Sequence, residues 1–197
     1  MNSAPSRADG SGTDSSAPER RDGAGGTVGT APRAPIRRVR PADAARIRAL
    51  RLEMLADAPL AFLETIADAA ARPHAEFAAR VAYTSRGSET AQFVADPGGR
   101  FVGHAGGTVA PREAGLTVIY AVYVTPAWRG TGLLGDLIDE VATWSRACGR
   151  PELLLEVVVG NDRAYRAYQR LGFTDTGVRV PHPTIPALTE LQMRRPA

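Results

Sequence analysis

The spacing of hydrophobic residues predicts a series of strands and helices that begins at residue 36. Alternating or uninterrupted β-branched segments predict strands at 36–40, 91–95, 100–109, 116–124, 152–159 and 188–194, with one more starting at Gly172. Apolar residues at helical spacing predict helices at 41–58, 134–148 and 161–171, and weaker helical regions at 62–73 and 75–82. With the early region taken as two helices, the order is β-α-α-β-β-β-α-β-α-β-β. This order predicts an α/β (α+β) fold, a mixed sheet with helices on its faces.

Residues 1–35 have a different composition from the rest of the chain. Apart from alanine, their only apolar residues are Met1 and Val28, and they are dense in Ser, Gly, Pro and Thr. Such a segment cannot bury enough apolar surface to offset its ordering entropy, which predicts a disordered extension before a single domain at 36–197. No apolar stretch of the kind found in secretory signals follows Met1, and we expect a cytoplasmic protein.

Composition excludes several classes of protein. All 24 basic residues are arginine, so the lysine of a Walker-type phosphate loop and the lysine of a Schiff-base enzyme are both missing. Cys148 is the single cysteine and the three histidines are scattered, so we expect no metal site. The longest apolar stretch, residues 116–124, is too short to span a membrane, and we expect no membrane partner.

The net charge of +3 is only mildly basic. It suits an anionic ligand, but no Arg-rich helix with interleaved aromatic residues is present, and we expect no nucleic-acid partner. The short cluster of Arg37, Arg38 and Arg40 fits the polar face of a strand better than a binding patch.

A glycine-rich loop, Arg-Gly-Thr-Gly-Leu-Leu at residues 129–134, lies between a predicted buried strand and an amphipathic helix. Glycines let a phosphate approach the backbone closely, and the N–H groups at the start of a helix favour an anion. Arg129 can bond the phosphate or hold the loop. Gly130, Gly132 and Gly135 also match the dinucleotide pattern G-x-G-x-x-G, with Glu156 on the next strand. Two observations argue against a dinucleotide-binding site. Five residues separate the strand from the first glycine, and too few βα units follow.

The last predicted helix places unusual residues along one face. Asn161, Ala164, Tyr168 and Gly172 fall at spacings of three, four and four, within one stripe of the helix. Small residues there allow a ligand to lie against the helix, and a tyrosine can donate a proton. We expect the arginines of this helix, Arg163, Arg166 and Arg170, to face solvent on the opposite side.

These two segments together resemble the GNAT superfamily of N-acetyltransferases, in its bacterial form. The family's loop pattern [Q/R]-x-x-G-x-[G/A] fits the segment that starts at Arg129, and N-x-x-A-x-x-x-Y-x-x-x-G-F is matched in full from Asn161 to Phe173. The close similarity covers residues 116–175. One departure is Leu134, which stands where the pattern has Gly or Ala, and we expect its side chain to point into the core.

The resemblance implies an acetyl-CoA-dependent enzyme with a mostly antiparallel sheet of six to seven strands, about four flanking helices, and a splay between strands 4 and 5. It also implies that an amine attacks the thioester directly in a ternary complex and that Tyr168 protonates the leaving thiolate. Glu156 is the best candidate base, because the fourth strand lacks the usual Glu. A carboxylate among Leu and Val residues is costly unless it is paired or neutral, and the alternative to a role as base is a Glu156 that pairs with Arg129 or faces water. The residues implied in acetyl-CoA binding are Val122, Tyr123, Val124, Arg129, Gly130, Thr131, Gly132, Leu133, Leu134, Asn161 and Ala164.

Two alternatives and several acceptors stay open at this point. The missing acid in the fourth strand allows a non-catalytic, acyl-CoA-binding regulatory member of the same fold, and a dinucleotide oxidoreductase is a remote alternative. The acceptor is a small amine or a protein N-terminus, and a homodimer is also compatible with the resemblance. We expect the specificity to come from residues 41–85 and from the Pro-rich segment 178–188.

Overall fold

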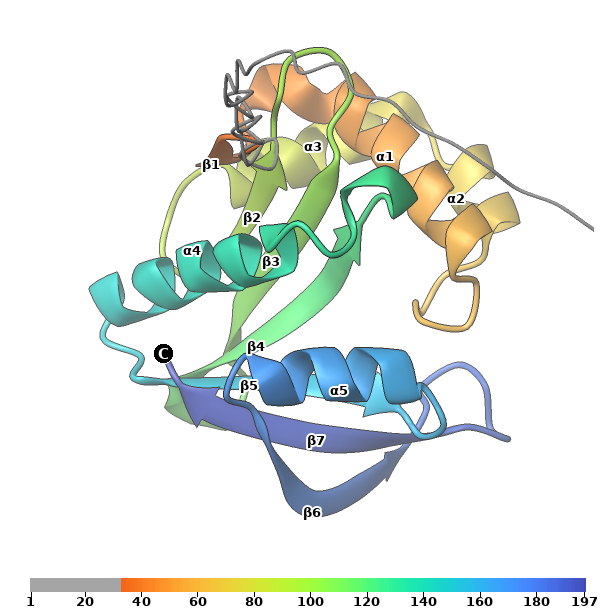
Figure 1. Ribbon diagram of the computed structural model, residues 1–197. Coiled ribbons are helices and arrows are strands. Elements are labelled where there is room, and N and C mark those ends of the chain that lie inside the picture. Colours follow the sequence, from red (N-terminus) through yellow and green to blue (C-terminus); the bar gives the residue numbers. More distant parts are fainter. Residues whose placement is uncertain (1–32) are drawn as a thin grey trace, which may run out of the picture. The chain divides into compact units, whose positions relative to one another are not determined.

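A seven-stranded sheet organises residues 33–197, the part of the chain that this computed structural model describes (Figure 1). Its strands are β1 (Ile36–Arg38), β2 (Thr90–Ala95), β3 (Gly103–Ala110), β4 (Glu113–Val124), β5 (Glu152–Val158), β6 (Thr174–Pro181) and β7 (Thr189–Pro196). They lie in the order β1-β2-β3-β4-β5-β7-β6, and every neighbouring pair is antiparallel except β4 with β5. The expected mixed, mostly antiparallel sheet is therefore confirmed. Residues 1–35 were expected to be disordered. Of these, residues 1–32 lie outside the described range, so that expectation stays a prediction.

Five α-helices accompany the sheet, where about four were expected. They are α1 (Ala44–Asp57), α2 (Ile66–Ala71), α3 (His74–Thr84), α4 (Leu133–Ala147) and α5 (Asp162–Arg170). The five helices fall in the five helical regions that the apolar spacing predicted, and α2 is a short part of the weaker region at 62–73. Thr65 starts it as an N-cap, since its Oγ1 accepts the N–H of Asp68 at 3.1 Å. No helix within residues 33–197 is both long enough and apolar enough to cross a membrane.

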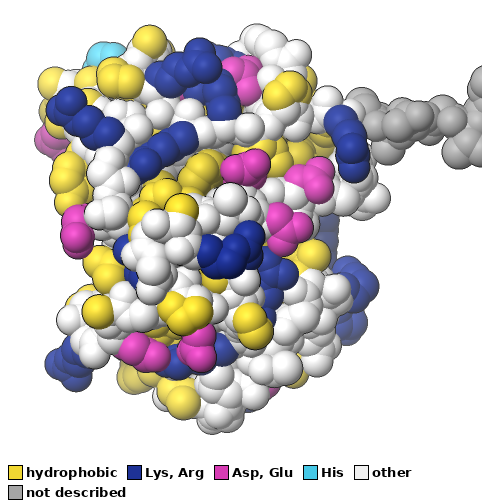
Figure 2. Space-filling view, turned by 90° about the vertical axis from the view of Figure 1, so that its left-hand side faces the viewer, with side chains coloured by type: hydrophobic (Ala, Val, Ile, Leu, Met, Phe, Trp, Pro, Cys, Tyr) yellow, Lys and Arg dark blue, Asp and Glu magenta, His cyan; other side chains and the backbone are white. Residues whose placement is uncertain are grey.

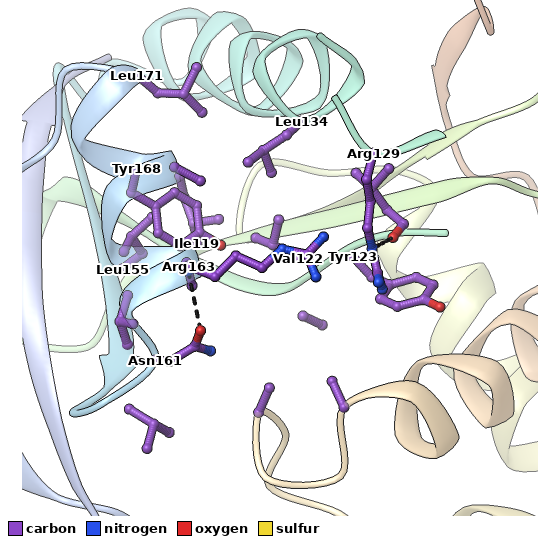
Figure 3. Close-up of a pocket in the computed structure, with 18 of the residues that line it drawn as sticks. Ile119, Val122, Tyr123, Arg129, Leu134, Leu155, Asn161, Arg163, Tyr168 and Leu171 are labelled. Atoms are coloured by element: carbon purple, nitrogen blue, oxygen red, sulfur yellow. Dashed lines mark hydrogen bonds between the residues drawn. The ribbon is translucent and has the colours of Figure 1, made fainter. Parts of the chain in front are cut away.

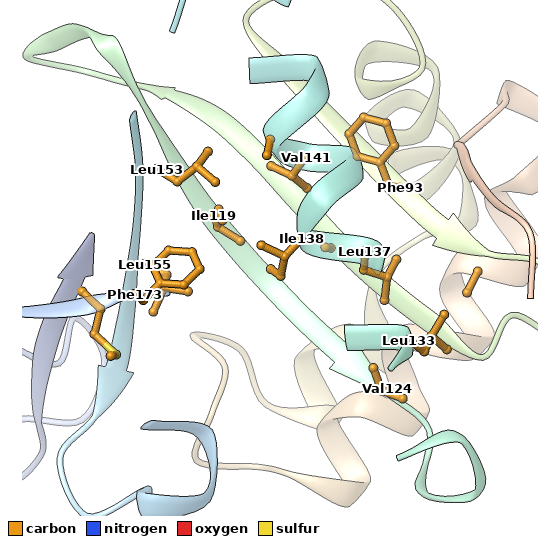
Figure 4. Packing of buried hydrophobic residues seen from close by; sticks show 14 of the residues in the cluster. Phe93, Ile119, Val124, Leu133, Leu137, Ile138, Val141, Leu153, Leu155 and Phe173 are labelled. Carbon is orange, nitrogen blue, oxygen red and sulfur yellow. The ribbon is translucent and has the colours of Figure 1, made fainter. Parts of the chain in front are cut away.

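The two faces of the sheet carry separate hydrophobic clusters. Strand alternation divides them, because Phe93 of β2 belongs to one cluster and its neighbour Val94 to the other. Helices α4 and α5 cover the first face, where Leu137, Ile138 and Val141 of α4 are fully buried (Figure 4). Helices α1, α2 and α3 cover the second. Each large side chain buried in this way contributes about 1.5–3 kcal/mol.

The arginines of β1 serve the fold. Arg37 donates to the carboxylates of Asp43 and Asp96 at 2.6 and 2.7 Å, so it joins β1 to the start of α1 and to the end of β2. Arg38 donates to the backbone oxygen of Thr90 at 2.9 Å. On the face of the molecule in Figure 2, basic side chains lie among acidic ones.

A buried polar cluster lies where β4 and β5 pair. The side chain of Arg150, which is 5% exposed, donates to Thr117 Oγ1 at 2.8 Å and to the backbone oxygen of Ser88 at 2.9 Å. Ser145 of α4 completes the cluster, with its hydroxyl 2.7 Å from that of Thr117. The Arg150 guanidinium also packs on the Trp144 ring, 4.5 Å from its centroid. This cluster fixes the point from which the two strands diverge.

Candidate active site

A cleft opens between β4 and β5 because the two strands pair over only three residues. Residues Leu116, Thr117 and Val118 of β4 face residues 152–154 of β5, and no pairing of the two strands continues beyond them in the described chain. Past that point, a cavity of about 640 Å³ extends between the strands, α5 and the loop before α4 (Figure 3). The expected splay between strands 4 and 5 is confirmed.

A β-bulge reshapes β4 next to the cleft. Gly106 of β3 faces Tyr120, but His104 faces Tyr123, so Ala121 and Val122 together oppose one residue of β3. Ala121 adopts a left-handed conformation with φ of 51°. Its carbonyl oxygen accepts a hydrogen bond from Nδ1 of buried His104 at 2.7 Å. Because β5 has diverged, the cleft side of this backbone stretch has no strand partner.

The loop before α4 presents a row of unused backbone donors. Gly132 is the N-cap of α4 with φ of 92°, a conformation that favours glycine. The first backbone N–H taken up by the helix is that of Asp136, which bonds the oxygen of Gly132, and none of the N–H groups of residues 130–135 has a backbone acceptor within the described part of the chain. Gly130, Gly132, Leu134 and Gly135 line the cavity. The loop therefore fits an anionic group such as a phosphate.

The side chains of this loop hold it in place. Arg129 donates from Nε to the oxygen of Val124 at 3.0 Å, pairs with Asp57 of α1, and lies over the Tyr123 ring. The backbone N–H of Arg129 donates to the oxygen of Pro126. Two roles were open to Arg129, binding a phosphate or holding the loop, and these contacts show that it holds the loop. The hydroxyl of Thr131 donates to the oxygen of Trp128 at 2.8 Å.

The expected contact of Leu134 with the core is confirmed in part. Leu134 is half-buried, packs against the first hydrophobic cluster and also lines the cavity. Leu133, which is 3% exposed, is the more deeply buried residue, because it lies one turn before Leu137 on the same buried stripe. Leu134 therefore forms a wall of the site, where the family pattern has a small residue.

Helix α5 forms the opposite wall. Asn161 caps it, because its Oδ1 accepts the N–H of Ala164 at 3.2 Å, and both residues line the cavity. The expected solvent exposure of Arg163, Arg166 and Arg170 is confirmed. Arg163 and Arg170 nevertheless also line the cavity, and Figure 3 shows Arg163 extending into it, because a long side chain can reach the cavity while its end stays exposed.

Tyr168 lies on the cavity side of α5. Its ring packs edge-to-face on Phe173, with the centroids 5.8 Å apart. Figure 3 shows its hydroxyl directed across the cavity toward β4, near Ile119. Burial raises the pKa of Tyr168, so the phenol keeps its proton. The chemistry available here is proton donation into the space between β4 and β5.

Glu156 lines the cavity from β5, but it is exposed rather than buried. Of the arrangements that the sequence left open, the structure shows a Glu156 that faces water, where β5 no longer pairs with β4. Its Oε1 accepts a hydrogen bond from Gln192 Nε2 at 2.9 Å. Glu156 does not pair with Arg129, which instead pairs with Asp57.

Sequence reasoning missed Glu190, which lines the cavity together with Glu156 and Asp57. It lies on β7 and is 8% exposed. The remaining wall comes from the end of α1 and the loop that follows, through Asp57, Ala58, Ala61 and Phe62. The early helical region thus contributes to the cavity as expected, whereas residues 178–188 are not among the lining residues that the structure describes.

The sequence was compared with models of protein families. The Acetyltransferase (GNAT) family matches residues 53–173, which is more than half of the chain. The chain belongs to the GNAT acetyltransferase family. A search of curated proteins gives no significant match. A mostly antiparallel GNAT sheet does not supply the successive parallel βα units that a dinucleotide fold requires, so the remote dinucleotide alternative does not fit.

Solved GNAT structures share this fold at low sequence identity. A phosphinothricin acetyltransferase from Sinorhizobium meliloti, solved in complex with acetyl-CoA, is 22% identical with a TM-score of 0.67, covering 83% of this chain and 88% of that one. A ribosomal-protein-alanine N-acetyltransferase from Brucella melitensis is 22% identical with a TM-score of 0.64, covering 83% and 99%. A GCN5-related N-acetyltransferase from Kribbella flavida is 24% identical with a TM-score of 0.64, covering 83% and 97%. At these identities the similarity shows the fold alone.

Most residues that line the cavity, but not all, lie within the segment that matches the GNAT family. Every residue expected to bind acetyl-CoA lies within residues 53–173, as do Glu156 and Tyr168. Glu190 and Gln192 lie beyond the matched segment. The cavity therefore combines residues inside the matched segment with Glu190 of β7, which lies beyond it.

Proposed function

We propose that this protein transfers the acetyl group of acetyl-CoA to a primary amine by direct attack in a ternary complex. The observation that carries the proposal is the row of unpaired N–H groups at residues 130–135, which opens into the same cavity as Tyr168 and the diverging ends of β4 and β5. A phosphate-binding loop, an unpaired strand and a protonated acid in one cavity are the parts that acyl transfer from a CoA thioester needs.

The pyrophosphate of acetyl-CoA would bind on the N–H groups of residues 130–134, at the positive end of the α4 dipole. The guanidinium groups of Arg163 and Arg170 add positive charge to this cavity. The pantetheine chain would lie along Val122, Tyr123 and Val124, where the β4 backbone has no β5 partner. Asn161 and Ala164 form the wall of α5 against which it would pack.

The reaction then requires three protein groups. A backbone N–H of β4 near the bulge would polarise the thioester carbonyl, an oxyanion-type contribution. Glu156 would take a proton from the attacking nitrogen, and the hydroxyl of Tyr168 would give its proton to the departing thiolate. Burial raises the pKa of Tyr168, which keeps that proton available until the thiolate forms. The acceptor is a small amine or a protein N-terminus.

Calorimetric titration of acetyl-CoA into the full chain, with NADH in parallel, tests this proposal. We expect micromolar binding of acetyl-CoA and none of NADH. Screening a panel of amines for release of free CoA thiol then tests catalysis. Tight acetyl-CoA binding without thiol release from any amine would favour the non-catalytic regulatory alternative, and a lack of acetyl-CoA binding would overturn the proposal altogether.

A further inference from the structure

Glu190 is a buried carboxylate that the protein leaves without a partner. It lies on β7, is 8% exposed, and lines the main cavity. The charged groups that act on it within the described chain are Glu156 and His182, and it has no hydrogen bond from a side chain there. Burial, with Glu156 nearby, raises the pKa of Glu190. The oxygens of Glu190 are not among the fully buried, unpartnered atoms of residues 33–197, so they open into the cavity, and an unpaired carboxylate that faces a cavity suits a cationic ligand.

The side chain of His182 bonds within its own turn and not to Glu190. Its Nδ1 accepts the N–H of Ile185 at 3.1 Å and that of Thr184 at 3.3 Å. Among the described residues, Glu190 forms no hydrogen bond or ion pair with His182 and no salt bridge with an arginine.

The sheet register places Glu156 beside Glu190. In the β5–β7 pair, Glu156 faces Gln192 and Val158 faces Glu190. Residues two apart on a strand share a face, so the two carboxylates are diagonal neighbours on the same face, with Cβ atoms about 7 Å apart. Both line the cavity, and Gln192 holds one oxygen of Glu156 from the same face. An ammonium group fits between two carboxylates at this spacing.

We propose that Glu190 and Glu156 form the acceptor subsite, which selects a primary ammonium with no carboxylate beside it and removes its proton before attack. The inference rests on the acetyl transfer proposed above and assigns its acceptor class. Free α-amino acids carry a carboxylate next to the amine, which would face the two glutamates and be repelled. Alkylamines, amino acid amides and peptide N-termini carry none.

The proton balance requires two acceptors. An ammonium that becomes an N-acetyl amide loses two protons from nitrogen, one before attack and one as the C–N bond forms and the C–S bond breaks. Glu190 takes the first and Glu156 the second, while Tyr168 gives its own proton to the thiolate. One proton then returns to Tyr168 and the other leaves to water, so the net products are the amide, the CoA thiol and one proton.

The test compares Glu190→Gln with the wild-type protein on pairs of acceptors. Each pair is an amino acid amide and the corresponding free amino acid, which differ only in the carboxylate. We expect the wild type to prefer the amide by at least about tenfold in kcat/KM, and E190Q to lose most of that preference. E190Q should also raise KM for the amide about tenfold, with the acetyl-CoA Kd unchanged within about twofold.

Two controls separate this effect from damage to the fold. Glu152→Gln removes an exposed carboxylate of the same strand β5, which pairs with Arg194 outside the cavity, and should leave the amide preference unchanged. E190Q should melt no lower than the wild type, because it removes an unpaired buried charge. Glu190→Leu removes the charge a second way and should lose the same preference.

The outcomes are distinguishable. Acetyl-CoA binding and thiol release with an unchanged preference in E190Q and E190L would overturn this inference alone. A wild type that prefers free amino acids would also overturn it. Failure to bind acetyl-CoA, or to release thiol with any amine, would overturn the proposed function and this inference with it.

Discussion

Nδ1 of His104 donates a hydrogen bond to the carbonyl oxygen of Ala121 and so ties β3 to the bulge of β4. The donor sense follows because a carbonyl oxygen can only accept. Ala121 has φ of 51°, which a residue with a side chain adopts only where its surroundings hold it. Since Ala121 and Tyr120 line the cavity, this buried bond helps to set the backbone against which the thioester is proposed to lie.

His104 should make the protein less stable in mild acid. Burial lowers the pKa of His104 to about 4, whereas a histidine in the unfolded chain titrates at about 6.5. Above the unfolded value both states are neutral. Between about 6.5 and 4 only the unfolded chain gains the proton, so the free energy of unfolding falls, by about 3 kcal/mol over the whole window.

His104→Asn tests this, because an amide can still donate to Ala121 but does not titrate. Denaturant unfolding of both proteins at pH 7.5, 6 and 5 should show the wild type losing its advantage over H104N as the pH falls. His74→Asn, at an exposed histidine, is the matched control and should follow the wild type. A constant difference between the wild type and H104N across this range would contradict the prediction.

Arg150→Lys should lower the free energy of unfolding, because Arg150 anchors the part of the fold where β4 and β5 pair. A lysine cannot reproduce the planar group that donates to Thr117 and Ser88 while packing on Trp144. Losing a buried hydrogen bond from a charged donor costs about 1.5–3 kcal/mol, and we expect a loss of that size in the free energy of unfolding. Arg146→Lys, at an exposed arginine of α4, should change it by less than about 0.5 kcal/mol. Equal effects of the two substitutions would refute a structural role for Arg150.

The parts of the site that depend on local sequence could be predicted. Asn161, Ala164 and Tyr168 lie on one helix, so their common wall follows from a helical period, and the loop at 129–134 follows from its glycines. The order of strands and helices along the chain also follows from the pattern of apolar residues. In each case residues close in sequence determine the outcome, whereas the order of the strands within the sheet does not follow from such patterns.

The parts that depend on distant pairing could not be predicted. Glu190 enters the cavity only because β7 pairs with β5, a contact between segments more than thirty residues apart that no local pattern reveals. The alternation of β7 does place Glu190 and Gln192 on one face, a signal that acquires meaning once the partner strand is known. Leu134 lies at the margin of the buried stripe of α4, where it contacts both the core and the cavity, and the apolar pattern alone does not separate these two environments.

Tyr168→Phe should slow turnover without weakening acetyl-CoA binding. The variant removes the proposed proton donor but keeps the ring that packs on Phe173. We expect kcat to fall by about 10- to 1,000-fold, the usual range for a general acid, and the acetyl-CoA Kd to stay within about twofold. Tyr165→Phe, on the same helix and outside the residues that line the cavity, is the control. Unchanged turnover in Y168F would remove Tyr168 from catalysis.

Gly132→Ala should weaken acetyl-CoA binding beyond its effect on stability. Gly132 has φ of 92° and directs the unpaired N–H groups at the start of α4 into the cavity, so a side chain there strains the backbone that binds the phosphate. Gly149, at the other end of α4, has φ of 74° and, like Gly132, has open space where a Cβ would lie. Gly149→Ala therefore imposes a similar strain of about 1–2 kcal/mol far from the ligand. Calorimetry should show about tenfold weaker acetyl-CoA binding for G132A and no change for G149A, while thermal unfolding shows similar losses for both. Equal affinities in the two variants would mean that the loop before α4 does not bind the phosphate.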